Sequence, residues 1–391
     1  MDFKFTPEDE SFRQELRTFL ETELPGTWEG GGRYPEEDDW DLTRVIRRRM
    51  ADRGWLTMHW PEEYGGQGAS PVKSAIFNEE IAYLRAPGRD IFGVRMLGPT
   101  LMIHGSEEQK RTHLPPVARG EVQWCQGYSE PESGSDLASL STRAVRDGDD
   151  LVINGGKIWT TLAHRADWIM LLTRTDPDAP KHRGISFVLV DMKSPGVTVR
   201  PIINMAGGHE FNQVLFDNVR VPRANVVGEE DRGWYVAVTL LDFERSGIDY
   251  SANARRLLDD VREYATETKR NGQPLMEVPW VRSLMADRYI ECEVARLIAY
   301  NVAYMQGQGL VPTREASMSK VFGSETVRRV TEAAMDVLGL YGTLGREEKW
   351  APLRGRVQEH WMLSFSGTIA AGTSEVQRNI IAGRGLGLPR G

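Results

Sequence analysis

The chain has 391 residues, of which 40% are hydrophobic, so it can form a large core divided over roughly two or three domains. Its net charge of −8 and pI of about 5.6 argue against a nucleic-acid-binding surface, and no uncharged apolar run reaches the about 20 residues of a membrane span. Two cysteines, scattered histidines and an acidic beginning unlike a signal peptide lead us to expect a cytoplasmic protein without disulfides or a metal site.

Residues 1–121 are predicted to form a helical domain. The first helix is expected within residues 5–24, with Thr6 as its N-cap. Its apolar residues share one face, which is typical of an amphipathic helix packed on a core: Phe12, Leu16, Phe19 and Leu20. Further helices are expected within residues 43–55 and 74–87.

Residues 122–232 are predicted to form a β domain. Short segments rich in β-branched and aromatic residues follow one another here, as is typical of strands. The pairs Asp147-Gly148 and Asn154-Gly155 predict turns between these strands, because both favour positive φ angles.

Residues 233–391 return to a helical period. Helices are predicted over four ranges: 234–270, 278–309, 313–339 and 372–384. Asn271-Gly272 is expected to end the first of them, and Ser374 and Gln377 have the spacing of a capping box. Long helices with short connections predict an antiparallel bundle. The order of helices, strands and helices predicts an α+β multidomain protein, and the lack of βαβ alternation argues against a Rossmann fold.

Two motifs in the β domain are candidates for a ligand site. Ser133-Gly134-Ser135-Asp136 can cradle phosphate oxygens with hydroxyls and free backbone N–H groups, although a short motif of this kind is more often a strand end with an N-cap at Ser135 or Asp136. Trp159, followed by Thr160 and Thr161, offers a flat aromatic face and hydroxyl donors, although a lone tryptophan is more often a core residue.

The complete set of motifs resembles the acyl-CoA dehydrogenase family over essentially the whole chain. The segments that carry the resemblance occur in the family's order: MDFKFTPEDESFRQELRTFL, WPEEYGGQGAS, GSEEQKRTHLPPVARGE, SEPESGSDLASL, INGGKIWTT, GTSEVQRNIIA and GLGLPR. The resemblance implies a helical N-terminal domain, a middle β-barrel-like domain and a C-terminal four-helix bundle. It also implies bound FAD and, in most members, a tetramer.

The resemblance also implies roles for individual residues in FAD binding. Gln126, Tyr128 and Ser129 would line the flavin, with Trp159 packed on one face of the ring and Thr161 bonded to its polar edge. Ser135 would lie where the pyrophosphate meets acyl-CoA. Three further residues would approach FAD from the C-terminal domain: Gly342, Thr373 and Glu375. The family commonly has an arginine where this chain has Thr268, and Arg270 is the candidate to replace it.

The family's usual catalytic base is missing. The reaction removes the α-proton of an acyl thioester with a carboxylate while the β-hydrogen leaves as hydride, and many members place a glutamate just before the glycine of the GTS motif. That position is Ala371, which cannot take a proton, although its backbone N–H can donate to the thioester oxygen.

A second family position for the base matches Glu244. On a continuous helix, Ala237, Leu241, Glu244 and Ile248 would share one face, and a carboxylate on an apolar face is costly unless it is paired or functional. The alternative is an ion pair with an arginine. Arg245 resembles a family arginine at the substrate site and would orient the thioester or the glutamate.

The substrate is predicted to be bulky. Ala370 and Ala371 replace two large side chains that are common at this loop, and the facing segment also has small residues: Ser246, Gly247, Ser251 and Ala252. We therefore expect a roomy cavity for a branched, ring-bearing or steroid-derived acyl group.

Three alternatives remain at this point. The chain can be one half of an α2β2 heterotetramer whose related subunit completes the site. It can be a flavin oxidase of the same fold, although such relatives often place an aspartate at the base position. It can also be a non-enzymatic binding protein, for instance one that associates with DNA, although the acidic balance opposes this. In the favoured interpretation, electrons pass to an electron-transfer flavoprotein, and the assembly is a homotetramer or α2β2.

Overall fold

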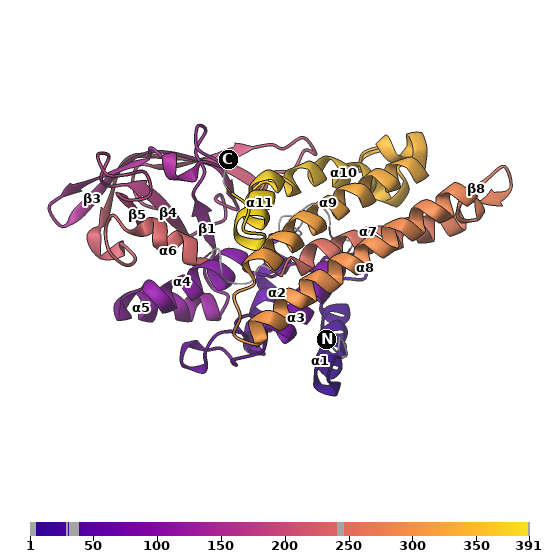
Figure 1. Ribbon diagram of the computed structural model, residues 1–391, viewed down its shortest axis with the longest axis horizontal. Helices are drawn as coiled ribbons and strands as arrows, with labels where there is room; N and C mark the ends of the chain where they lie inside the picture. The colour runs from indigo at the N-terminus through magenta and orange to yellow at the C-terminus, as the bar shows by residue number, and fades with distance from the viewer. Residues whose placement is uncertain (1–4, 29, 31–38, 241–245, 390–391) are drawn as a thin grey trace. The chain divides into compact units, whose positions relative to one another are not determined.

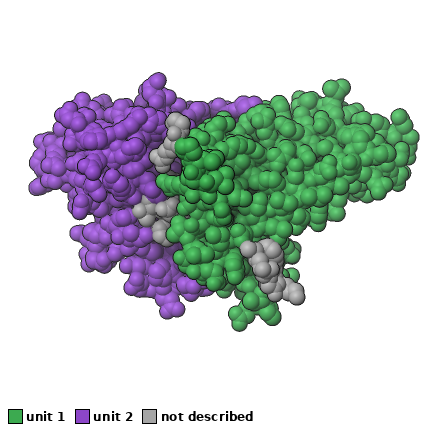
Figure 2. Space-filling model, viewed as in Figure 1, with its two compact units in different colours: residues 1–38, 70–87, 244–391 green, residues 39–69, 88–243 purple. Residues whose placement is uncertain are grey.

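The computed structural model describes residues 5–28, 30, 39–240 and 246–389. The chain, drawn as a ribbon in Figure 1, divides into two compact units, which Figure 2 shows in different colours and which are described separately. The first unit contains residues 1–38, 70–87 and 244–391, and the second contains residues 39–69 and 88–243. The predicted domain boundaries after residues 121 and 232 stay predictions.

The second unit contains the β-sheet and several short helices. Its helices are α2 (Trp40–Asp52), α4 (Gly98–His104), α5 (Glu107–Ala118) and α6 (Gly233–Leu240), with a π-helical turn at Ile91–Leu97. Its strands are β1 (Trp124–Gly127), β2 (Arg143–Asp147), β3 (Asp150–Thr161), β4 (Trp168–Arg174), β5 (Ile185–Asp191), β6 (Val197–Ile202) and β7 (Phe211–Pro222). Short 3-10 turns lie at Glu62–Tyr64, Leu137–Ser139 and Arg223–Asn225.

These strands form one seven-stranded sheet in the order β1-β4-β2-β3-β7-β6, with β5 paired to β4. β4 and β5 are buried along almost their whole length, which explains their continuous apolar sequences. Met170 and Leu172 of β4 contribute to a core with residues of α4 and α5, whereas Ile169 and Leu171 contribute to a second core on the other side of the strand. The sheet therefore separates two hydrophobic cores.

The first unit is helical. Its helices are α1 (Pro7–Glu23), α3 (Pro71–Tyr83), α7 (Ile248–Glu267), α8 (Pro279–Gly307), α9 (Thr313–Leu338), α10 (Arg356–Gly367) and α11 (Ser374–Ile380). A small hairpin joins β8 (Lys269–Arg270) to β9 (Gln273–Pro274), and shorter turns lie at Leu275–Glu277, Gly339–Thr343, Pro352–Gly355 and Ile381–Gly385. Helices α7, α8 and α9 pack on one another and α10 packs on α9, which gives a four-helix arrangement around a shared apolar core. No helix of the described ranges is both long and apolar enough to cross a bilayer.

Several predicted elements are confirmed. α1 begins after Thr6, whose side chain accepts the Asp9 N–H while the Asp9 carboxylate accepts the Thr6 N–H, so the pair forms a capping box. All four predicted apolar residues of α1 are buried. The Asp147-Gly148 turn is also confirmed, because it joins β2 to β3 with Gly148 at φ +64°.

The predicted single helix over residues 234–270 is wrong. α6 ends at Leu240 and α7 begins at Ile248, after Ser246 and Gly247, which are not helical. Gly247 lies at φ +70°, a conformation that ends or precedes a helix, and a Cβ on it would lie 2.8 Å from Ser319 Oγ. The break therefore combines a left-handed backbone with close packing against α9.

Two further local predictions are wrong, and both concern Asn-Gly pairs. Asn271-Gly272 does not simply end a helix but forms the two-residue turn of the β8–β9 hairpin, with φ angles of +53° and +82°. Asn154-Gly155 is not a turn between strands. It lies inside β3 at a β-bulge, with Gly155 at φ +142° and so close to Thr142 that a Cβ would lie 2.8 Å away.

The predicted capping box of Ser374 with Gln377 is also wrong. The N-cap of α11 is Thr373, whose hydroxyl accepts the Val376 N–H at 3.2 Å. Gln377 instead donates from Nε2 to the Ala371 carbonyl at 3.4 Å.

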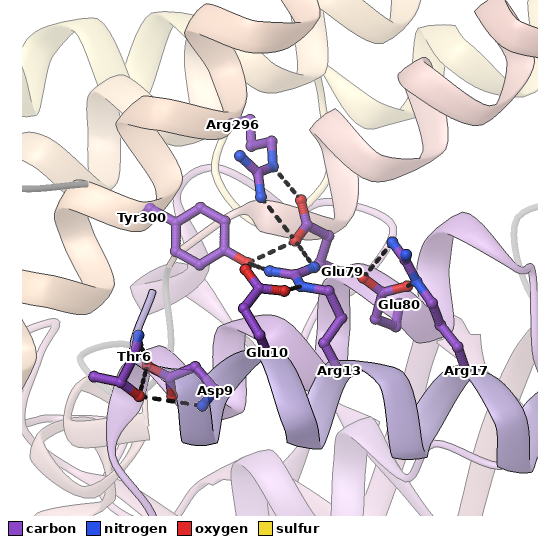
Figure 3. A network of polar contacts seen from close by, with 9 residues as sticks. All are labelled: Thr6, Asp9, Glu10, Arg13, Arg17, Glu79, Glu80, Arg296 and Tyr300. Carbon is purple, nitrogen blue, oxygen red and sulfur yellow. Dashed lines mark hydrogen bonds and ion pairs between the residues drawn. The ribbon is translucent and has the colours of Figure 1, made fainter. Parts of the chain in front are cut away.

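Helix α1 is fastened to α3 and α8 by a buried ionic network (Figure 3). Arg13 Nη1 donates to Glu79 Oε2 at 2.7 Å and to Glu80 Oε1 at 2.5 Å. Tyr300 and Arg296 also donate to Glu79, and Arg17 donates to Glu80. Burial alone would raise the pKa of Glu79, but hydrogen bonds and positive charge from Arg296 and Arg13 lower it below the ordinary value.

This network predicts unequal effects for two arginine substitutions. Arg13→Met removes a donor from two buried carboxylates and is expected to destabilise the fold by about 3–5 kcal/mol, as for other broken buried pairs. Arg17→Met removes a side chain that is 44% exposed and is expected to cost less than about 1 kcal/mol. Thermal unfolding of the two variants at pH 7 and at acid pH measures both losses of stability.

The loss of stability caused by Arg13→Met should become smaller at acid pH. The lowered pKa of Glu79 contributes stability above its unfolded pKa of about 4.3, and this contribution is lost as the pH falls through the folded value. Equal losses for the two variants at pH 7 would contradict the assignment of the buried network to Arg13.

Candidate active site

Trp159 projects from a bulge near the end of β3. Lys157 pairs with Val214 and Thr160 pairs with Asn212, so Ile158 and Trp159 together face the single residue Gln213. Trp159 has φ +60° and is 58% exposed. A left-handed backbone at a bulky residue costs about 1–3 kcal/mol and typically marks a functional site. The alternative that Trp159 is a core residue is therefore wrong.

The two residues that follow Trp159 are buried, unlike Trp159 itself. Thr160 and Thr161 are buried, and Thr161 pairs with Phe211 of β7. Phe211 also meets Trp159 edge to face, with ring centroids 6.2 Å apart. Phe211 thus supports the indole while much of the ring stays accessible.

The end of β1 lies next to this bulge. The Ile158 N–H donates to the Ser129 carbonyl at 2.9 Å, which brings Gln126, Tyr128 and Ser129 beside the Trp159 segment. The Tyr128 ring is buried against Phe187, and its hydroxyl has no hydrogen-bond partner among the described residues. Burial raises the pKa of Tyr128. Five predicted flavin-lining residues therefore meet in one unit.

A buried ion pair, which the sequence analysis missed, fastens these two segments together. Lys157 Nζ donates to Glu130 Oε1 at 2.8 Å and to the Tyr128 carbonyl at 3.1 Å. Glu130 also accepts the N–H groups of Ser141 and Thr142 at 2.6 and 2.9 Å. The sequence could have indicated that Lys157 is buried, because it lies an even number of positions from buried residues of β3 and therefore on the same face of the strand.

The pair has perturbed pKa values with clear causes. Burial would raise the pKa of Glu130. The positive charge and hydrogen bond of Lys157, together with hydrogen bonds from Thr142 and Ser141, instead lower this pKa to about 2. Burial lowers the pKa of Lys157 to about 8, with Glu130 opposing the change. At neutral pH the pair is therefore ionised, and removal of either partner alone would leave the other as an unpaired buried charge.

Glu130→Gln is expected to lower the thermal unfolding midpoint at pH 7, because Lys157 would lose its buried counter-charge. The lowered pKa of Glu130 means that its stabilisation is present above the unfolded value near 4.3 and is lost as the pH falls toward about 2. The difference between wild type and variant should thus shrink over that pH range. Glu132→Gln, at an exposed position in the same turn, serves as the matched control. An unchanged midpoint for Glu130→Gln would contradict the ion pair's role.

The predicted phosphate cradle lies on the surface. Ser135 and Asp136 are exposed, and no atom lies within 4 Å of a Cβ placed on Gly134. Asp136 precedes the single 3-10 turn Leu137–Ser139, accepts the Ser139 hydroxyl at 2.7 Å and pairs with Lys181. Asp136 therefore occupies the expected N-cap position but caps no backbone N–H with its side chain, while the neighbouring Gly134 leaves room for a ligand.

The C-terminal residues that were predicted to contact FAD lie in the helical unit. Thr373 caps α11, and the pKa of Glu375 is lowered by its own backbone N–H and by Thr373. Ala371 is exposed and has φ +54°, which is strained for alanine. Its neighbour Gly372 follows at φ +88°.

Arg270 and Gly342 lie in the same part of this unit. A Cβ on Gly339 would lie 3.7 Å from Arg270 Nη2, and Gly339 begins the turn that contains Gly342. A Cβ on Gly342 would lie 3.2 Å from Leu338 and 3.3 Å from Met335 Sδ. Close packing on α9 therefore explains this glycine without a ligand.

The predicted base lies outside the described residues. Glu244 and Arg245 both fall in the segment 241–245. The part of the helical-face argument that included Ile248 is wrong, because Ser246 and Gly247 are not helical, and the position of Glu244 itself stays a prediction. Only the resemblance still supports Glu244 as the base.

Comparison with known proteins decides the family. Models of the acyl-CoA dehydrogenase N-terminal, middle and C-terminal domains match residues 6–121, 125–219 and 231–386. The chain is a member of the acyl-CoA dehydrogenase family. It is therefore an oxidoreductase that dehydrogenates acyl-CoA, and the predicted fold class is confirmed.

Several acyl-CoA dehydrogenases match over their full length. FadE26 of Mycobacterium tuberculosis is 39% identical, over 100% of this chain and 99% of the relative, and IpdE1 of the same organism is 37% identical over 97% and 98%. Among solved structures, the ChsE4–ChsE5 complex from M. tuberculosis has a TM-score of 0.91 at 39% identity, covering 100% of both chains. The Tcur3481–Tcur3483 steroid ACAD has a TM-score of 0.89 at 35% identity, also covering 100% of both chains.

Proposed function

We propose that the chain binds FAD against the Trp159 bulge and removes hydrogen from the α and β carbons of an acyl-CoA thioester. The observation that carries this proposal is Trp159 itself: an exposed aromatic ring, held in a strained conformation, beside the buried Thr161 and the end of β1. Such strain persists only where surrounding contacts enforce it, as the Lys157–Glu130 pair does here. These residues fit a flat heteroaromatic group.

Each predicted residue keeps a proposed role. Trp159 packs on the flavin ring, Thr161 bonds its polar edge, and Gln126, Tyr128 and Ser129 line it. Ser135 lies at the pyrophosphate and acyl-CoA. The C-terminal residues that approach FAD are Arg270, Gly342, Thr373 and Glu375. FAD, when bound, supplies the acceptor for the β-hydride.

Glu244 is the proposed base for the α-proton. A base must lie within about 3 Å of that proton and be shielded from water, so that its pKa approaches neutrality. The Ala371 N–H is proposed to donate to the thioester oxygen, where negative charge grows, and Arg245 to orient the thioester. This assignment rests on the family pattern, since Ala371 has no acidic group.

The proposed substrate carries a branched, ring-bearing or steroid-derived acyl group. Gly247 lies against Ser319, so this member of the run of small residues serves helix packing rather than a cavity. Ala370 and Ala371 remain the main sequence support for a wide site. The similarity to a steroid ACAD adds to it.

Anaerobic mixing with acyl-CoAs tests the reaction and the base together. Purified protein would be mixed with straight-chain, α-methyl-branched and sterol-derived acyl-CoAs while the flavin absorbance is followed. We expect bleaching, fastest with the sterol-derived thioester. Glu244→Gln should slow bleaching by about 10³-fold or more while FAD stays bound, because the proton acceptor is lost. Asp242→Asn, in the same segment, is the control and should bleach at nearly the wild-type rate.

The outcomes separate the alternatives. Preference for unbranched chains would remove the bulky-substrate proposal, and rapid bleaching by Glu244→Gln would remove the base. A chain that binds no FAD until a related chain is co-expressed would indicate a half-site, and fast turnover with oxygen alone would indicate an oxidase. Electron-transfer flavoprotein is the proposed acceptor, and the cytoplasm is the proposed compartment, on the strength of two free cysteines.

We also propose that α8 supports assembly into a homotetramer or an α2β2 heterotetramer. Four exposed apolar side chains recur on it at helical spacing, in a pattern typical of a helix-pairing face: Ile290, Val294, Leu297 and Tyr304. The ChsE4–ChsE5 structure is itself a complex of two named chains.

The double substitution Ile290→Glu with Leu297→Glu should lower the molecular mass in solution to that of a smaller species, because it buries charge in the proposed interface. Light scattering coupled to size-exclusion chromatography measures the mass. Val145→Glu, at an exposed apolar position on β2, should leave the mass unchanged. Loss of assembly in the control alone would place the interface elsewhere.

A further inference from the structure

Asn212 of β7 lies at the centre of a polar cluster beneath the Trp159 bulge. It is fully buried, and its side-chain nitrogen lies 3.2 Å from the Thr160 carbonyl and 3.0 Å from His164 Nδ1. Its side-chain oxygen lies 2.9 Å from His209 Nε2. The imidazole rings of His164 and His209 are stacked with centroids 4.1 Å apart. None of the roles assigned above involves these three residues.

The Thr160 carbonyl fixes the direction of every hydrogen bond in this cluster. A carbonyl only accepts, so the atom of Asn212 that faces it must be the NH₂ group. The same nitrogen faces His164 Nδ1, which must therefore be an acceptor, with the ring proton on Nε2. The oxygen of Asn212 then faces His209 Nε2, which must donate. Asn212 thus uses both of its hydrogens and one lone pair.

The segment that Asn212 holds is strained on both sides. Trp159 and Leu162 have φ angles of +60° and +58°, although neither is glycine. Thr160 and Thr161 lie between them. The Leu162 N–H donates to the Glu210 carbonyl at 2.9 Å, so β7 and the residues before it hold this segment at a second point. Two strained residues in four need such external contacts to persist.

We propose that Asn212, held by the stacked His164–His209 pair, is a positioning residue that sets the bulge so that Trp159 and Thr161 present the flavin-binding surface. An apolar side chain of similar size would fill the space but leave the Thr160 carbonyl without this donor. The peptide between Thr160 and Thr161, which pairing with β7 also holds, would then lose one of its contacts, and both flavin contacts would shift. The inference rests on the proposed function, because it assumes that Trp159 and Thr161 contact FAD.

The test compares Asn212→Leu with wild type in FAD affinity and in the flavin spectrum. Apoprotein would be titrated with FAD while flavin fluorescence is followed, and the absorbance and circular dichroism of the bound flavin would be recorded. We expect Asn212→Leu to weaken FAD binding by about tenfold, the size of one lost buried hydrogen bond, and to alter the flavin spectrum. With acyl-CoA, kcat should fall while KM changes little.

A matched control removes a buried polar group from the same sheet without touching the bulge. Thr173 of β4 is fully buried, and its hydroxyl has no hydrogen-bond partner among the described residues, so Thr173→Val should leave FAD affinity and spectrum unchanged. Asn212→Asp is the second variant, which decides the matter if Asn212→Leu does not fold. It keeps the shape but turns an acceptor toward the Thr160 carbonyl, and the same weakening of FAD binding is expected.

A double-substitution cycle shows whether Asn212 acts through the bulge. In a Trp159→Ala background, Asn212→Leu should weaken FAD binding by clearly less than in wild type, because the contact it positions is already gone. If Asn212→Leu and Asn212→Asp lower only the unfolding midpoint, the inference is overturned while the proposed function stands. If wild-type protein binds no FAD, or Trp159→Ala binds FAD as tightly as wild type, the proposed flavin site fails instead.

Discussion

The candidate site depends on one buried ion pair. Lys157 and Glu130 neutralise each other in the interior of the sheet-containing unit, and each also bonds backbone groups of the segments that meet there. Lys157 belongs to β3 and Glu130 to the chain that follows β1, so the pair fixes the distance between the two walls of the proposed flavin surface. Charges in this position are tolerated only when they are fully paired, which makes their geometry narrowly defined.

A well-defined scaffold permits local strain. Trp159 and Leu162 adopt left-handed backbone angles that cost stability, and the surrounding hydrogen bonds of Ser129, Asn212 and Glu210 offset that cost. The result is a preorganised aromatic surface that needs no rearrangement before it meets a flat ligand. Preorganisation of this kind lowers the ordering cost of binding.

The break before α7 has a different consequence. Gly247 takes a left-handed angle and lies against Ser319, so α7 begins as a separate helix rather than as a continuation of α6. The run from Ala237 to Ile248 is therefore not one continuous helical face, and Glu244 lies outside the described residues.

The sequence by itself determined the elements whose causes are local. The capping residues of α1 lie three positions apart, and the apolar runs of β4 and β5 are contiguous, so both could be predicted. The order of motifs was enough to identify the family. Positive φ angles at Gly155 and at Asn271-Gly272 were also predictable, yet the first pair forms a bulge and the second a hairpin turn. Only pairing with a distant strand, or its absence, decides between them.

The Lys157–Glu130 pair and the Asn212 cluster join residues 27 and 52 positions apart. No local preference specifies such contacts, because their free energy appears only when the sheet has formed.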